Sequence, residues 1–232
     1  MSVRDYIRIA LYGAFAGIAI GLGGLLNIVA NSYLYPAVAG KIIGSLLFPI
    51  GLSLVCFLDL NLFTGKIGYV LDNDKSFLIK LLFIYIGNII GSLIFGGWAL
   101  VVFKNGALYE TVLSIASKKL FELSFRPIIK VFGGSVLCGA LVYLAVFSYK
   151  TFKQVYLKLI GIFLAIGLFV FLGFDHCIAN MFYFTFSWSW KNPVAYLNIA
   201  IVTFGNSIGA IALNEGIKAG KKLFKKNEEK SL

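Results

Sequence analysis

The chain has 232 residues, of which 59% are hydrophobic, 16% aromatic and only 13% charged. Soluble domains are about 45–50% apolar and about 25% charged, so this composition excludes a water-soluble enzyme, a secreted disulfide domain and a disordered chain. The mean hydropathy is +0.89. The apolar residues fall in six blocks, each long enough to cross a bilayer core, which takes about 20 helical residues. We therefore predict an all-α integral membrane protein with six transmembrane helices.

The formal net charge of +11 comes from cations at span ends and in loops, not from one basic face. This distribution argues against a nucleic-acid partner and indicates contact with anionic membrane lipids. Six spans with both termini on one side place 14 of the 21 lysines and arginines on that side. The positive-inside rule then predicts a multi-pass protein of the cell inner or plasma membrane with cytoplasmic N- and C-termini.

Two of the six spans are too long and too interrupted to be simple helices. The second contains Asn61 and Thr64 inside an apolar block, and the fifth contains Asp175, His176 and Asn180. Non-helical backbone at membrane depth persists only where it is buried in protein or lines a cavity, so two broken helices indicate a pathway. The six predicted spans, in chain order, are 7–31, 42–71, 77–103, 128–149, 156–188 and 194–217.

An internal repeat relates the two halves of the chain. Ile-Gly-Leu at 50–52 recurs at 166–168, and Gly-Asn-x-x-Gly at 87–91 recurs at 205–209. Each half then holds three spans, and an odd number of spans forces the copies into opposite orientations. The two glycines of 87–91 also form a small-xxx-small ladder, which allows close helix contact.

These features predict one channel domain over 1–232, built as an inverted 3+3 repeat with broken second and fifth helices. Its halves cover approximately 7–103 and 126–217, and 218–232 forms a solvated, frayed, basic cytoplasmic tail. The mixed segment 105–126 is predicted to be an amphipathic helix on the outer interface.

Metal, cofactor and catalytic sites are not indicated. One histidine, His176, cannot assemble a metal site, which needs three or four ligands. The three cysteines, Cys56, Cys138 and Cys177, are isolated in apolar surroundings and are predicted to be small buried hydrophobes. No P-loop, Gly-x-Ser-x-Gly or His-Glu-x-x-His pattern occurs, so the chain is not expected to be an enzyme.

Polar residues at the two breaks are the candidates for function, because ionisable groups at membrane depth are costly. We expect Asp175 to cap the second half-helix and His176 to line the pore, where it could exchange protons with a weak acid near neutral pH. Thr64 and Asn180 lie 116 positions apart, at equivalent places in the two breaks. Each of them either faces the path or hydrogen-bonds backbone groups.

Three further polar residues lie near the breaks. Asp59 pairs with Lys66 or Lys158, or faces a vestibule; the sequence leaves these alternatives open. Asn88 and Asn206, one in each half, are placed to hydrogen-bond the free carbonyls of the broken segments.

Together these motifs resemble the formate/nitrite transporter family. Phe-Pro-x-Gly at 48–51 followed by Leu-Phe-Thr-Gly at 62–65 is similar to its second-span motif. Gly-Phe-Asp-His-Cys-Ile-Ala-Asn-Met at 173–181 is similar to its fifth-span signature. Leu-Val-Tyr-Leu-Ala-Val-Phe at 141–147 and the paired Gly-Asn-x-x-Gly also fit.

The resemblance implies an aquaporin-like protomer assembled as a homopentamer, with a pore for small monovalent anions in each subunit. A bare charge is costly in an apolar slit, whereas a neutral weak acid is not. The pore residues that match the family by position are Phe48 and Phe169 at the outer constriction, Leu52 and Leu62 at the inner one, the loop threonine Thr64 and the central histidine His176.

Four departures from the family pattern stand out. Asp175 replaces a glutamate, Gly139 an asparagine and Asn61 an acidic residue, while Leu123 stands where the vestibule lysine belongs. Lys119, one turn away, is the candidate to replace that lysine. These departures resemble the hydrosulfide-channel branch, whose substrate is HS⁻.

The resulting prediction is a pentameric channel for HS⁻ that also passes formate- and nitrite-like anions. A proton-coupled formate or nitrite transporter stays open as an alternative, because it would need the same slit and histidine. A neutral-solute aquaporin-type pore is the third reading, and it would require Asn-Pro-Ala at both breaks, which neither has.

Overall fold

The computed structural model describes residues 2–231, with side chains to residue 223, and within them every element is helical. Six helical segments of the described chain are long and apolar enough to cross a membrane, as predicted. They are α1 (Val3–Tyr33), α2 with α3 (Ala37–Leu47 and Pro49–Phe57), α5 (Ser76–Phe103), α7 (Phe125–Thr151), α8 (Val155–Leu172) and α10 (Pro193–Ser231). The shorter elements are α4 (Phe63–Lys66), the 3₁₀ helix η1 (Ile67–Asp72), α6 (Ala107–Ser117), α9 (Cys177–Phe186) and the 3₁₀ helix η2 (Ser189–Lys191).

The second and fifth spans are broken, as the sequence predicted. In the second, Pro49 starts α3 directly after α2, and 58–62 then runs as a non-helical segment before α4. In the fifth, Gly173 ends α8 with a φ of 75°, a left-handed conformation that glycine adopts without a steric penalty. An extended segment then leads into α9.

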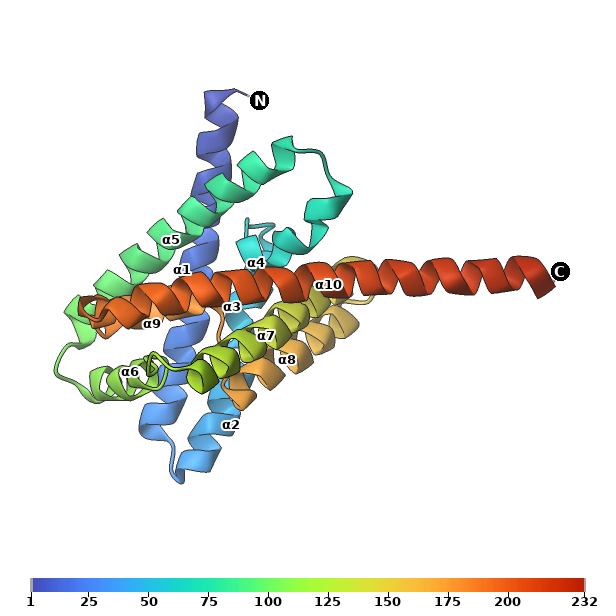
Figure 1. Ribbon diagram of the computed structural model, residues 1–232. Coiled ribbons are helices and arrows are strands. Elements are labelled where there is room, and N and C mark those ends of the chain that lie inside the picture. Colours follow the sequence, from blue (N-terminus) through green and yellow to red (C-terminus); the bar gives the residue numbers. More distant parts are fainter. Residues whose placement is uncertain (1, 232) are drawn as a thin grey trace.

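The predicted end of the sixth span at 217 and the predicted fraying after it were wrong, because α10 continues unbroken to Ser231. Its polar end projects away from the bundle (Figure 1). Part of the predicted tail, the side chains from 224 onward and residue 232, lies outside the described residues. The interface helix is also shorter than the predicted 105–126, since α6 covers only Ala107–Ser117.

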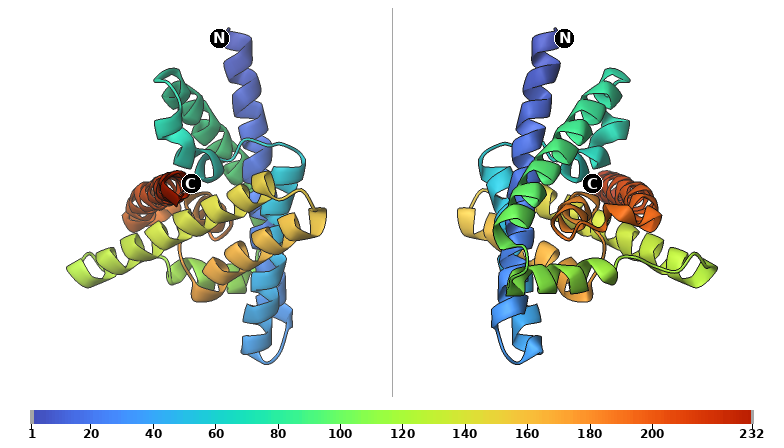
Figure 2. Two further views of the ribbon diagram at one scale, coloured as in Figure 1. Left: turned by 90° about the vertical axis from the view of Figure 1, so that its right-hand side faces the viewer. Right: turned by 90° about the vertical axis from the view of Figure 1, so that its left-hand side faces the viewer.

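The two halves repeat one packing scheme. α1 packs against α5 in the first half, and α7 packs against α10 in the second. The two pairs run in steeply different directions (Figure 1, Figure 2). Glycines make each contact possible: a Cβ at Gly91 would collide with the carbonyl oxygen of Ala14, and a Cβ at Gly209 with that of Val136. The structure thus confirms the repeat, and the two broken spans meet between the packed pairs.

Candidate functional site

Two asparagines hold the breaks in matching ways. The Asn88 Oδ1 accepts from the N–H of Phe63, the first residue of α4, at 2.8 Å, and its Nδ2 donates to the Asn61 main-chain carbonyl at 2.8 Å. In the second half, Asn206 accepts from the N–H of Cys177, the first residue of α9, at 3.0 Å. Its Nδ2 donates to the Asp175 carbonyl, also at 3.0 Å.

Both asparagines are fully buried, and these bonds satisfy backbone groups that a broken helix leaves free. The predicted scaffold role is confirmed. The bonds also correct the register of the repeat at the breaks, where Asn61 corresponds to Asp175 and Phe63 to Cys177. The offset there is 114, from 175 − 61 and 177 − 63, rather than the 116 that paired Thr64 with Asn180.

Thr64 and His176 come from opposite halves and meet at the centre. The Thr64 Oγ1 lies 2.8 Å from the His176 Nε2, and both side chains are buried. The His176 Nδ1 accepts from the N–H of Ala179 at 3.2 Å. This network assigns the proton of a neutral imidazole to Nε2, which then donates to Thr64.

The prediction that Asp175 caps α9 was wrong, because His176 is the N-cap residue. Side chains of successive residues in extended backbone point to opposite faces. The imidazole therefore faces the start of α9 while the carboxylate faces away from it. Asp175 Oδ1 instead accepts from Lys119 Nζ at 2.6 Å and from Asn180 Nδ2 at 2.9 Å.

Asn180 bonds side chains rather than backbone groups. Its Nδ2 also donates to the Asn198 Oδ1 at 2.9 Å, and its own Oδ1 is buried without a partner among the described residues. Asn198 completes the network by donating to the Lys119 carbonyl at 3.0 Å. Asn198 was not among the residues predicted from the sequence, although a polar residue two helical turns before Asn206 in an apolar block was a usable signal.

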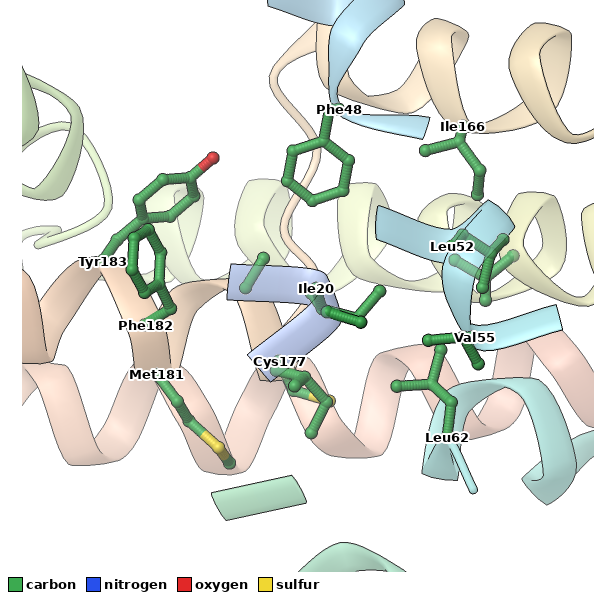
Figure 3. Close-up of a cluster of buried hydrophobic side chains, with 14 of the residues drawn as sticks. Ile20, Phe48, Leu52, Val55, Leu62, Ile166, Cys177, Met181, Phe182 and Tyr183 are labelled. Carbon is green, nitrogen blue, oxygen red and sulfur yellow. The ribbon is translucent and has the colours of Figure 1, made fainter. Parts of the chain in front are cut away.

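An apolar slit borders His176. The Phe48 and Phe169 rings meet edge to face, with centroids 5.8 Å apart, and Phe169 also stacks on His176 at 6.0 Å. Figure 3 shows Phe48 and Leu52 in one cluster of buried side chains. The space left open is only about 10 Å³, no more than a single water needs. Its lining residues are Ile20, Phe48, Leu52, Leu62, Val142, Ile166, Phe169 and His176.

A vestibule opens on each side of this slit. The α6-side vestibule has a volume of about 400 Å³, and Asn27, Lys41, Lys118, Lys119, Asp175 and Asn180 are among its lining residues. The α4-side vestibule has a volume of about 170 Å³, and Asp59, Leu62, Lys66, Tyr149 and Lys150 are among its lining residues. Lys119, the candidate vestibule lysine, thus lies in a vestibule.

Of the alternatives for Asp59, the vestibule-facing one is confirmed. Lys66 donates instead to the Asn61 Oδ1 at 2.6 Å, and Lys158 lies over the Tyr149 ring at 4.6 Å. Among the described residues, Asp59 has no ion pair. Nor do any three His, Cys, Asp or Glu side chains of the described chain gather where they could hold a metal ion.

Six spans and two broken helices that meet at a slit between vestibules define a polytopic membrane transport protein. The family model for formate/nitrite transporters matches residues 2–219, so the chain belongs to that family. The predicted resemblance is confirmed, and the family is one of transporters and channels, not enzymes.

Relatives and a solved structure agree with this assignment. The nitrite transporter NirC of Escherichia coli (strain K12) is 29% identical over 230 residues, which cover 93% of this chain and 84% of NirC. A probable formate transporter of Methanothermobacter thermautotrophicus is 30% identical over 87% of this chain and 84% of its own. A solved pentameric formate channel with formate bound shares the fold with a TM-score of 0.71, at 23% identity and 97% coverage of both chains.

Proposed function

We propose that the protein is a membrane channel for small monovalent anions, with HS⁻ as the main substrate and formate and nitrite as further ones. The observation that carries the proposal is His176, which lies 2.8 Å from Thr64 and is the one polar residue among those that line the apolar slit. The names of the relatives support formate and nitrite as substrates. The preference for HS⁻ rests on the family departures at Asp175, Gly139 and Asn61.

The slit separates charged from neutral species. A bare anion leaves the water of a vestibule only at a high free-energy cost, whereas a hydrogen-bonded anion or its neutral acid crosses more easily. The Nε2–H of His176 can donate to the anion in place of Thr64.

In this proposal Phe48 and Phe169 form the constriction toward the α6-side vestibule, and Leu52 and Leu62 the one toward the α4-side vestibule. Asp175 and Asn180 hold Lys119 at the mouth of the first. The chain over 1–232 works as one channel domain with cytoplasmic termini. Five copies assemble with one pore in each, as the description of the solved formate channel suggests.

Stopped-flow uptake into proteoliposomes tests the proposal. HS⁻, formate, nitrite, chloride and glycerol are presented in parallel at several pH values, and protein-free liposomes correct for H₂S that diffuses through lipid. We expect fast HS⁻ uptake, similar or slower formate and nitrite uptake, and exclusion of glycerol. Glycerol uptake without anion selectivity would move the protein to the neutral-solute class.

The same liposomes separate a channel from the proton-coupled alternative. An imposed proton gradient drives formate above its electrochemical equilibrium in a coupled transporter. In a channel for the anion, formate follows the membrane potential instead. We expect the second behaviour.

A further inference from the structure

One hydrogen bond joins the scaffold helices of the two halves. The Tyr85 hydroxyl of α5 lies 2.8 Å from the Thr203 Oγ1 of α10. Tyr85 precedes Asn88 by one helical turn and Thr203 precedes Asn206 by one, so Tyr85 and Thr203 are equivalent positions of the repeat. Equivalent residues of an inverted repeat meet only near the axis that relates the two halves. The bond therefore lies close to that axis.

The two helices that the bond joins have little other direct contact. α5 packs on α1 and α9, and α10 packs on α7. Among the side-chain hydrogen bonds of the described residues, the Tyr85–Thr203 bond is the one that links α5 to α10. The bilayer core holds no water that would compete for the two hydroxyls. The bond thus fixes how far apart the scaffold helices lie.

The Tyr85 end of the bond supports the break that holds Thr64. The Tyr85 ring packs on Phe63, the residue before Thr64, with the ring centroids 4.9 Å apart. The N–H of the same phenylalanine is held by Asn88, one turn further along α5. A shift of Tyr85 therefore moves the residue next to Thr64.

The Thr203 end supports the break that holds His176. Thr203 lies one turn before Asn206 on α10, and Asn206 holds the N–H of Cys177, the residue after His176. Asn206 also donates to the main-chain carbonyl of Asp175, the residue before it. A shift of α10 at Thr203 therefore moves the backbone on both sides of the imidazole.

We infer that Tyr85 and Thr203 are positioning residues, whose hydrogen bond sets the separation of the two breaks and so keeps the Thr64 Oγ1 within hydrogen-bond distance of the His176 Nε2. Without this bond α5 and α10 are free to move apart, and the central pair separates with them. The consequence for transport rests on the proposed function, because there His176 donates to the anion. The geometric consequence at His176 does not.

The test reads the imidazole directly. His176 is the only histidine of the chain, so selective ¹⁵N-histidine labelling of protein without a histidine tag gives the NMR signals of one ring. Tyr85→Phe keeps the ring on Phe63 and removes only the hydroxyl. We expect the Nε2 resonance to shift and formate uptake into proteoliposomes to fall about threefold, as the loss of an interhelical hydrogen bond of average strength in a membrane predicts. Tyr196→Phe is the matched control, because Tyr196 of α10 is 60% exposed.

Two substitutions at Thr203 test the same bond from its other end. Thr203→Val removes the oxygen at nearly constant shape, whereas Thr203→Ser keeps it. We expect Thr203→Val to reproduce both effects of Tyr85→Phe, and Thr203→Ser to stay near wild type. Combining Tyr85→Phe with Thr203→Val should add nothing, because each single substitution already removes the bond.

An unmoved Nε2 resonance or wild-type uptake in Tyr85→Phe or Thr203→Val, in protein of wild-type size by size-exclusion chromatography, would overturn the inference. Additive effects in the double variant would do so too, as would an equal shift in Tyr196→Phe. These results would leave the proposed function standing. A wild-type protein that carries no anion would instead overturn the proposed function, while the NMR signals of His176 would still test the positioning.

Discussion

The imidazole of His176 is held from both ring nitrogens. Its Nδ1 accepts from the start of α9, and its Nε2 lies against Thr64 of the opposite half. The ring is therefore fixed in place, and it lines the slit. Because the same side chain is also the N-cap of α9, a substitution has to preserve capping if it is to test function alone.

His176→Asn meets that condition, since asparagine is among the best N-cap residues. We expect a folded protein with slower formate uptake than wild type, because the Nε2–H that can hydrogen-bond an anion next to the slit is gone. Proteoliposome uptake provides the measurement. Unchanged uptake would remove His176 from the transport step.

Thr64→Val and Thr64→Ser form a matched pair of controls for this prediction. Valine keeps the shape but removes the oxygen that accepts from Nε2, whereas serine keeps the oxygen. A slower uptake by Thr64→Val but not by Thr64→Ser would assign the effect to the hydrogen bond.

Most candidate side chains could be predicted from the sequence, but their partners could not. His176, Thr64, Phe48 and Phe169 do meet at one place. Asp175 was given the wrong partner because α9 begins one residue later than capping by Asp175 requires. An error of one residue in a helix boundary is ordinary, and in extended backbone it reverses the direction of a side chain.

In lipid there is no hydrophobic driving force that brings helices together, so these helices associate through close contact between their backbones. Gly91 of α5 lies against the Ala14 carbonyl of α1, and Gly139 of α7 against the backbone of Asn206 in α10. Each contact brings a scaffold asparagine within reach of its break. Helix spacing and the geometry of the slit are thus coupled.

Gly91→Ala tests this coupling, with Gly97→Ala as the control on the same helix. A Cβ at Gly91 collides with backbone, whereas a Cβ at Gly97 meets nothing within 4 Å. We expect Gly91→Ala to destabilise the protein by about 1–3 kcal/mol, as overpacking does, and to lower the apparent Tm by several degrees. Thermal aggregation in detergent, followed by size-exclusion chromatography, gives this measurement.

Gly97→Ala should leave the Tm unchanged or raise it slightly, because alanine favours helix by up to about 1 kcal/mol. Equal losses of Tm in the two variants would show that close packing at Gly91 is not what holds α1 to α5.

Helix boundaries could be predicted at the two breaks but not at the end of α10. The breaks followed from polar residues within apolar segments, whereas the change from apolar to charged residues near 217 did not end α10. Lysine and glutamate are good helix formers, so a charged extension can continue a helix that has already left the bundle.

For the whole molecule, an even number of spans puts the beginning of α1 and the end of α10 on one side of the membrane. The slit then lies between two vestibules that open to opposite sides. Ser76 is the first residue of α5, and α6 follows the end of α5 and borders the α6-side vestibule. Because α5 is one of the six spans, Ser76 and α6 are expected on opposite sides of the membrane. The charge asymmetry of the loops predicts that α6 faces away from the cytoplasm.

Single cysteines at Ser76 and Ser117, both exposed, test this orientation with a membrane-impermeant maleimide on intact cells. The background is Cys56→Ser, because Cys56 is half-buried in the α4-side vestibule, whereas Cys138 and Cys177 are buried. We expect Ser117→Cys to be labelled from outside and Ser76→Cys only after permeabilisation, which also shows that each thiol reacts. The reverse pattern would invert the orientation and put α6 on the cytoplasmic side. Labelling of both thiols in intact cells would contradict the six-span topology itself, because α5 would then fail to cross.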